Sequence, residues 1–260
     1  MTGFSRQDAS VRAASSGLIR LLRDEHHAGR ARWPNFDTIT TGAQYRHLHR
    51  LCDTWLPAGG HILDWGAGTG HASLYLSRVG HPVTGFSFEE FSFEDLLDGL
   101  PYRFVPGQAS EPTLLPFADD EFDGALSVGV LEHVRETGGT EAGSLADLHR
   151  VLRRGGVLVC VHLPNATSWI EAVARRREGA HVHPYVYHPR DVVRMFEDAG
   201  FDIESRGRYA ILPRNQVARI FPRALCDAEW FRRLYDLADS AGAFLVPWLT
   251  QNHFVVARAR

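Results

Sequence analysis

The middle of the chain alternates short apolar runs with longer segments whose apolar residues recur at helical spacing. Short apolar runs bounded by turn residues are typical of buried strands, and a repeat of three to four residues is typical of helices. The expected strands are 61–65, 82–86, 102–105, 122–128, 157–163, 201–205 and 253–257, and the main helices between them are 70–79, 89–97, 141–152 and 188–199. This alternation predicts a doubly wound α/β fold with helices on both faces of a largely parallel sheet.

Three stretches fall outside the alternation. The N-terminal part has helical spacing at 9–28 and 43–56, with a break at Pro34. The stretch between the last two strands is too long for a plain loop, and we expect helices at 216–221 and 228–241. Together with residues 164–187, these parts are expected to cover a substrate pocket. We therefore predict a single domain over 1–260, with an N-terminal helical lid (1–58), a core (59–206 and 251–260) and a lid insertion (207–250).

A glycine-rich loop follows the first expected strand. Gly66, Gly68 and Gly70 are spaced G-x-G-x-G between that strand and a helix, and Asp64 lies two residues before them. Glycine permits a tight turn and lets a ligand approach the backbone without a Cβ in the way. A dinucleotide-binding loop has a similar pattern, but its third glycine comes one residue later.

Five segments resemble class I methyltransferases that depend on S-adenosylmethionine (SAM). Among these, they are most similar to the small-molecule enzymes of the families called methyltransferase domain 11 and methyltransferase domain 12. They occur in the family's order, at 63–70, 117–123, 130–134, 148–156 and 198–201. The resemblance implies a Rossmann-like, seven-stranded sheet whose last strand is antiparallel. It also implies SAM as the cofactor and S-adenosylhomocysteine as its product. Trp65 and the Ser87-Phe88 pair are similar to residues in methyltransferases of surface-polysaccharide gene clusters.

The resemblance also implies a set of cofactor-binding residues, in which the loop wraps the methionine part of SAM and Asp64 supports its ammonium group. The set is Asp64, Gly66, Ala67, Gly68, Gly70, Ser87, Phe88, Gln108, Ala109 and Val128. Ser87 stands where the family usually has an acid for the ribose hydroxyls. Either Glu89 or Glu90 reaches back to the ribose, or the ribose is held less firmly. Gln108 stands where aspartate is common, and its carbonyl can still accept from the adenine amine.

Transfer from SAM depends mainly on alignment of the acceptor with the methyl group, but an oxygen or nitrogen acceptor must also lose a proton. Histidine suits this step near neutral pH. His133 follows the fourth strand and His162 ends the fifth, so both are expected at the edge where the methyl group lies. Each is a candidate catalytic base; a helix-start histidine bonded to its neighbours is an equal interpretation of His133.

A histidine-rich segment follows the fifth strand. His181 and His183 share one face if the segment is extended, but no carboxylate lies close by in sequence. The pattern favours a polar lid loop, and we expect no metal site. Upstream of the glycine loop, four residues are candidates for the SAM carboxylate, and the sequence does not choose among them: Trp33, Asn35, Tyr45 and Arg46.

Composition limits the partners and the location. All 28 basic residues are arginine, yet the formal net charge is −3, which gives no general attraction to nucleic acid. No apolar run is long enough to cross a bilayer, and the first residues lack a secretory pattern. The three cysteines form no C-x-x-C pair. We expect a cytoplasmic protein without nucleic-acid or membrane partners, whose possible homo-oligomerisation the sequence leaves open.

The leading hypothesis is transfer of a methyl group to an oxygen or nitrogen of a small molecule, such as a sugar or a natural-product-type metabolite. One alternative is a protein of the same fold that binds SAM without methylating. Another is an NAD-dependent oxidoreductase built on a similar sheet.

Overall fold

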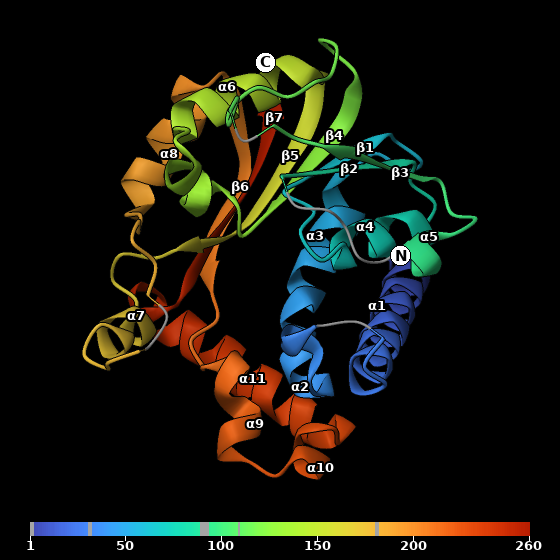
Figure 1. Cartoon of the computed structure of the whole chain (residues 1–260). Helices are drawn as coiled ribbons and strands as arrows, with labels where there is room; N and C mark the ends of the chain where they lie inside the picture. The colour runs from blue at the N-terminus through green and yellow to red at the C-terminus, as the bar shows by residue number, and fades with distance from the viewer. Residues whose placement is uncertain (1–2, 31–32, 89–93, 109, 180–181) are drawn as a thin grey trace.

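The computed structural model describes residues 3–30, 33–88, 94–108, 110–179 and 182–260. Its sheet has the order β3-β2-β1-β4-β5-β7-β6, and β7 runs antiparallel to both β5 and β6 (Figure 1). This confirms the expected seven-stranded α/β sheet with its antiparallel last strand. The strands are β1 (Ile62–Trp65), β2 (Val83–Ser87), β3 (Tyr102–Pro106), β4 (Phe122–Val128), β5 (Leu152–Pro164), β6 (Phe201–Tyr209) and β7 (Asn252–Ala259).

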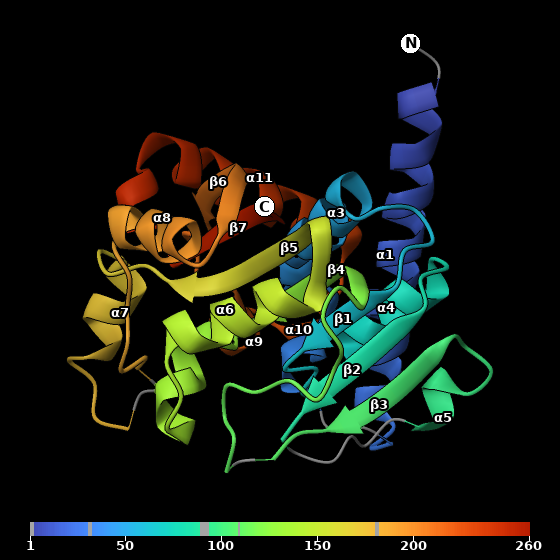
Figure 2. The ribbon, with the colours of Figure 1, turned by 90° about the horizontal axis from the view of Figure 1, so that it is seen from above.

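Helices cover both faces of the sheet (Figure 2). The α-helices are α1 (Gly3–His27), α2 (Ile39–Gly42), α3 (Arg46–Trp55), α4 (His71–Arg78), α5 (Glu94–Leu97), α6 (Glu141–Val151), α7 (Trp169–Ala174), α8 (Pro189–Asp198), α9 (Val217–Ile220), α10 (Arg223–Cys226) and α11 (Glu229–Leu245). Short 3₁₀ helices span Pro34–Phe36, Ala43–Tyr45, Leu131–Thr137, Arg214–Gln216 and Pro247–Leu249. None of the described helices combines the length and apolar character that a bilayer crossing requires.

The two faces hold separate apolar cores because side chains alternate along each strand. On β5, Val157 and Val159 join one core with Leu18 of α1, while Leu158 and Cys160 join the other. The first core also contains residues of α3 and α4, and the second contains residues of α6 and α8. Burial on both faces explains why the central strands read as continuous apolar runs in the sequence.

Local sequence features fix several helix ends. The Thr140 side chain accepts a hydrogen bond from the Gly143 N–H at the start of α6, and Ser168 accepts from Glu171 N–H at the start of α7. Pro189 begins α8, where its missing N–H has no intrahelical partner to lose. The starts of α6 and α8 agree with the expected helix starts to within one residue.

Several boundaries differ from the expectation. β5 begins at Leu152, and the expected Gly155–Gly156 turn is an irregularity within it, with φ of +78° at Gly155. β6 continues to Tyr209, because its polar last residues pair with β7. The insertion therefore leaves the sheet later than residue 207, and it contains the additional helix α10.

The N-terminal part and the insertion pack together beyond one end of the sheet, where α2 meets α9, α10 and α11 (Figure 1). The Thr40 hydroxyl donates to Cys226 O at 2.6 Å, and Ile39 N–H donates to Asp227 Oδ1 at 2.8 Å. By contrast, α1 and α3 join the core on one face of the sheet. The predicted N-terminal lid thus has two roles, since its middle part packs on the insertion and its longer helices pack on the sheet.

Candidate functional site

The glycine loop after β1 has a backbone that only glycine adopts easily. Gly66, Gly68 and Gly70 have φ values of +73°, +50° and +70°. A Cβ on Gly66 would lie 2.3 Å from Cγ2 of Val130. The N–H groups of Gly66 and Ala67 both donate to Phe86 O, at 2.8 and 2.9 Å. The loop is therefore fixed to the end of β2 and held tightly against the segment after β4.

Asp64 supports this loop from the end of β1. Its side chain is buried, and the Ser73 hydroxyl donates to Oδ2 at 2.6 Å. Burial raises the pKa of Asp64 to about 6, because few groups compensate its charge. A bound cation would restore the missing compensation, which suits a carboxylate expected to face an ammonium group.

A cavity of about 420 Å³, which we call the glycine-loop cavity, opens beside the loop. Five of the predicted cofactor-binding residues line it: Asp64, Gly66, Ala67, Gly68 and Val128. Thr69 and Gly129 continue the same wall. The glycine-lined wall and the buried carboxylate fit the amino-acid end of SAM, because backbone without side chains and a negative charge lie on the same cavity.

Four further predicted cofactor residues do not line this cavity. Gly70 begins the turn into α4, while Ser87 and Phe88 lie at the end of β2 and Gln108 follows β3. Gly107 N–H donates to Ser87 O at 2.8 Å, so the two strand ends lie side by side next to the loop. Their contact with adenosine stays a prediction. Ala109, Glu89 and Glu90 lie outside the described residues.

The four upstream candidates lie in three different places. Asn35 and Tyr45 line the glycine-loop cavity, and Asn35 Nδ2 donates to the Tyr45 hydroxyl at 2.9 Å. Trp33 is buried behind the loop and donates from Nε1 to Thr69 O at 3.2 Å. Arg46 lines a different cavity. Of the four, Asn35 and Tyr45 are placed to reach a ligand of the glycine loop.

His162 lies at the end of β5 with a φ of +66°, which is unusual for a residue with a side chain. Its backbone N–H donates to the Tyr209 hydroxyl at 2.9 Å, and its Nδ1 lies 3.2 Å from the same oxygen. Nδ1 is also 3.4 Å from Asn252 Nδ2. Burial lowers the pKa of His162 to about 4, so the imidazole is neutral at neutral pH.

His133, the first of the two predicted bases, lines the glycine-loop cavity beside Glu132 and His183. Its Nδ1 lies 2.8 Å from Glu136 Oε1, and Nδ1 of His183 lies 2.6 Å from Glu171 Oε1. Burial raises the pKa of Glu132 to about 7. Hydrogen-bonded partners of this kind orient a histidine side chain.

Glu132, His133 and His183 offer three ligand atoms within 4.8 Å of one another, so they are the described residues that could hold a metal ion. The sequence did not connect His183 with this group, because Glu171 and Glu132 reach His183 only through the fold. The absence of a resident metal stays a prediction. His181, which the sequence places beside His183, lies outside the described residues.

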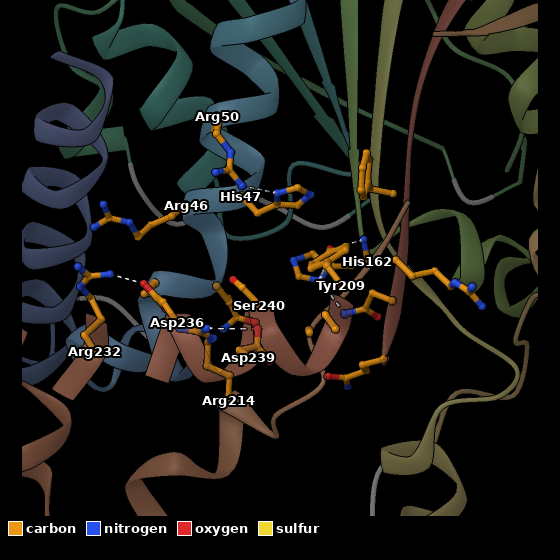
Figure 3. A pocket seen from close by; sticks show the side chains of 18 of the residues that line it. Arg46, His47, Arg50, His162, Tyr209, Arg214, Arg232, Asp236, Asp239 and Ser240 are labelled. Atoms are coloured by element: carbon orange, nitrogen blue, oxygen red, sulfur yellow. Dashed lines mark hydrogen bonds and ion pairs between the residues drawn. The ribbon is translucent and has the colours of Figure 1, made fainter. Parts of the chain in front are cut away.

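A second cavity of about 780 Å³ lies between α3, the end of β6 and α11 (Figure 3). We call it the arginine cavity, because its wall contains Arg12, Arg46, Arg50, Arg208, Arg214 and Arg232. It shares part of its wall with the glycine-loop cavity, and the shared residues are Gln44, His162, Asn215, Gln251 and Asn252. His133 lines only the smaller cavity. Among the two predicted bases, His162 alone lies where the two cavities meet.

The sequence analysis missed several residues of this junction. Gln251 and Asn252 lie at the start of the antiparallel strand β7, so they lie at the same edge as the carboxyl ends of the parallel strands. That rule could have identified them, because β7 was expected to be antiparallel. Tyr209 belongs to the unexpected polar end of β6, and Asn215 to a 3₁₀ helix in the insertion. No local pattern distinguishes these two from ordinary surface residues.

Comparisons with known proteins find a related domain and related folds. Residues 63–160 match the family model of a methyltransferase domain. The O-methyltransferase resE of Aspergillus sclerotiorum is 31% identical over 157 residues, which cover 56% of each protein. The chain spans about half the length of the curated relatives it matches, 56% of resE and 53% of the O-methyltransferase cnsE of Penicillium expansum.

Solved structures share the fold at low identity. A SAM-dependent methyltransferase from Methanosarcina mazei has a TM-score of 0.54 and 18% identity, covering 80% of this chain and 96% of that one. The [4+2]-cyclase SpnF also has a TM-score of 0.54, with 19% identity over 82% of this chain and 80% of that one. The family match identifies residues 63–160 as a methyltransferase domain, and the whole sheet has the fold of solved SAM-dependent methyltransferases.

Proposed function

We propose that this protein transfers the methyl group of SAM to an oxygen or nitrogen atom of a small molecule bound in the arginine cavity. His162 is the general base in this proposal. The supporting observation is that His162 lies in the walls of both cavities. Rapid transfer requires the acceptor atom and its base to be held together beside the methyl donor. A sugar or a natural-product-type metabolite is the proposed class of acceptor.

The chain's own residues would hold the cofactor at the glycine loop. Asp64 would face the ammonium group, while Gly66 and Gly68 would let the amino-acid end approach the backbone. Asn35 and Tyr45 lie on the same cavity and would meet the carboxylate. When bound, SAM supplies an electrophilic methyl group that an oxygen or nitrogen acceptor takes up as it loses a proton.

His162 is suited to receive that proton. Its lowered pKa keeps the imidazole neutral at physiological pH. In the tautomer with the proton on Nδ1, the imidazole donates to the Tyr209 oxygen and leaves Nε2 to accept a proton from the acceptor. Tyr209 is then a positioning residue, because it fixes the tautomer and the ring without touching the reacting atoms.

The first experiment measures cofactor binding to the full chain by calorimetry. We expect SAM and S-adenosylhomocysteine to bind and NAD to show no binding, and we expect the two SAM ligands to raise the melting temperature. A well-folded sample that binds NAD but not SAM would contradict the proposal.

The second experiment follows the methyl group. Methyl-labelled SAM is incubated with a panel of small phenols, alcohols, carboxylates and amines, and label is measured in the acceptor. We expect label transfer with wild type, and a loss of about 100-fold or more in His162→Asn with SAM binding kept within a few-fold. Equal label transfer by wild type and His162→Asn would remove His162 from the role of base.

A second candidate function is suggested by the similarity to SpnF, which is a [4+2]-cyclase. A protein of this fold can therefore carry out a reaction other than methyl transfer. Under this candidate the chain binds SAM, yet methyl label never leaves the cofactor with any member of the panel. Conversion of a panel compound without label in the product would favour it over methyl transfer.

A further inference from the structure

The arginine cavity has a strong excess of positive charge. Six arginines line it, against two carboxylates, Asp236 and Asp239, which gives a formal charge of +4 on the wall. The arginines are Arg12, Arg46, Arg50, Arg208, Arg214 and Arg232. The whole chain has a net charge of −3, so this concentration of arginine is local.

Both carboxylates are already occupied on the α11 side of the cavity. Arg214 donates from Nη1 to Asp236 Oδ1 at 2.7 Å and lies 3.5 Å from Asp239 Oδ2. Arg232 contacts the other oxygen of Asp236. Oδ1 of Asp239 also accepts the N–H groups of Ile211 and Leu212, at 2.8 and 2.7 Å. This network neutralises two of the arginines, and among the described residues of the cavity wall it leaves no further carboxylate to pair with Arg46 or Arg50.

Arg46 and Arg50 lie on α3, across the cavity from Asp236 and Asp239 (Figure 3). They are four residues apart and therefore share one face of the helix. Arg46 donates from Nη1 to the Ser16 hydroxyl at 2.9 Å, and within the described ranges no carboxylate lies within ion-pair distance of either guanidinium. Burial lowers the pKa of Arg46 together with the positive charges of Arg232 and Arg12, and the carboxylates of Asp236 and Glu229 offset only part of this effect.

His47 lies between these two arginines in sequence and lines the same cavity. Its Nδ1 is 3.1 Å from Arg50 Nη2, which makes Nδ1 an acceptor and places the ring proton on Nε2. Nε2 is buried without a hydrogen-bond partner among the described residues. The α3 side of the cavity thus presents the guanidinium groups of Arg46 and Arg50 and the Nε2–H donor of His47. Among the described residues, this donor has no hydrogen-bond partner.

We infer that the arginine cavity binds an acceptor that carries an anionic group, a carboxylate or a phosphate, held by Arg46 and Arg50. This inference rests on the proposed function, since it names the chemical class of the acceptor. A guanidinium binds both groups through paired N–H donors. The anion on α3 would anchor the molecule and direct its nucleophilic atom to His162 at the far wall, beside the glycine-loop cavity.

Simple probes test the inference on the full chain saturated with S-adenosylhomocysteine, so that only the arginine cavity is open. The probes are benzoate, phenyl phosphate and the neutral benzyl alcohol, titrated by calorimetry. We expect the two anions to bind at least about tenfold more tightly than benzyl alcohol. Tighter binding of phenyl phosphate than of benzoate then indicates a phosphate acceptor, and the reverse order indicates a carboxylate acceptor. Benzyl alcohol binding as tightly as both anions would overturn the inference.

Matched variants separate the site from general charge. Arg46→Gln and Arg50→Gln should each weaken binding of the anions about tenfold or more. Arg46→Lys should restore only part of the lost affinity, because lysine keeps the charge without the paired donors. Arg194→Gln, on the exposed side of α8 away from both cavities, removes the same charge and should have no effect. Equal weakening by Arg194→Gln would assign the binding to overall charge and reject the site.

The cofactor provides an independent readout of the proposed function. If the variants keep their affinity for S-adenosylhomocysteine and lose the anions, both proposals hold. If S-adenosylhomocysteine binds but Arg46→Gln and Arg50→Gln bind the anions as tightly as wild type does, the inference alone fails. The anions are also titrated without S-adenosylhomocysteine. If they bind through Arg46 and Arg50 in that titration but SAM does not bind to the protein, the proposed function fails and the anion site is retained.

Discussion

Nδ1 of His162 lies 3.2 Å from the hydroxyl oxygen of Tyr209, 47 positions later in the chain. The two residues lie near the ends of β5 and β6, and β7 separates these strands in the sheet. The contact exists because β6 continues further along β7 than its sequence suggests. The backbone N–H of His162 donates to the same oxygen, so Tyr209 fixes both the main chain and the ring.

The first prediction concerns this contact. Tyr209→Phe removes the oxygen that fixes the His162 tautomer, so we expect kcat to fall about tenfold and the affinity for SAM to stay within a factor of about two. Loss of this acceptor disfavours the protonated ring, so His162 should stay neutral in the variant and the fall in kcat should not grow between about pH 7 and about pH 5. Tyr185→Phe, which lines neither cavity, is the control. Unchanged kcat in Tyr209→Phe would show that Tyr209 does not position the base.

The second prediction concerns stability against pH. Burial lowers the pKa of His47, His162 and His253 to about 4 and that of His71 to about 3, and it shifts the pKa values of His49 and His61 in the same direction. Their unfolded forms take up protons near a pH of about 6.5, so the unfolded state binds more protons between that pH and the folded pKa values. Stability is therefore fully present above a pH of about 6.5 and is lost as the pH falls. The loss is about 1.4 kcal/mol per histidine for each pH unit that separates its folded and unfolded pKa values.

Asp64 and Glu132 act in the opposite direction, since burial raises their pKa values to about 6 and about 7. Two acids offset only part of the effect of the histidines, so we expect the melting temperature to fall between about pH 7 and about pH 5. His253→Gln should make the fall shallower, because glutamine can donate to Tyr187 O as His253 Nε2 does at 3.0 Å but does not ionise. A melting temperature that rises on acidification would contradict this prediction.

The sequence predicts the core of the fold well, because apolar periodicity reflects burial on both faces of the sheet. The expected strand 122–128 agrees with β4 at both ends, where the apolar run and the strand coincide. The end of β6 was missed because Arg206 and Arg208 are polar and paired only by β7. Similarly, α1 begins earlier than expected, since its first turns lack an apolar stripe.

The site was predictable only where a local motif carries it. Asp64 and the glycine loop follow from one short segment, and His162 follows from its place at the end of a strand. The arginine cavity does not, because α3, β6 and α11 each contribute arginines that read separately as solvated surface. Only the tertiary structure shows that Arg46 faces this cavity rather than the glycine loop.

The third prediction concerns the charge of Asp64. Asp64→Asn keeps the size of the side chain and removes the charge expected to face the ammonium group of SAM. We expect the Kd for SAM to rise about 10- to 100-fold, with a melting temperature equal to or above that of wild type, because burial already disfavours the charged form. Ser73→Ala removes the 2.6 Å hydrogen bond to Asp64 but keeps the carboxylate, and should change the Kd by a few-fold at most. Calorimetry on both variants measures this, and an unaltered Kd in Asp64→Asn would exclude contact with the ammonium group.

The last prediction compares two glycines with nearly the same backbone. Gly66 and Gly59 have φ values of +73° and +69°, so alanine costs a similar left-handed strain, about 1 kcal/mol, at either position. A Cβ on Gly59 meets nothing within 4 Å, whereas one on Gly66 lies 2.3 Å from Cγ2 of Val130. The extra clash must move the loop or the segment after β4, and both border the glycine-loop cavity.

We therefore expect Gly59→Ala to lower the melting temperature by a few degrees with normal SAM binding. Gly66→Ala should lower it further and weaken SAM binding at least about tenfold. Thermal denaturation and calorimetry on the two variants provide the measurement. If Gly66→Ala bound SAM as tightly as Gly59→Ala does, the prediction that the glycine loop lies close to bound SAM would be wrong. A loss in both variants would instead point to backbone strain as the common cause, since only that feature is shared by the two positions.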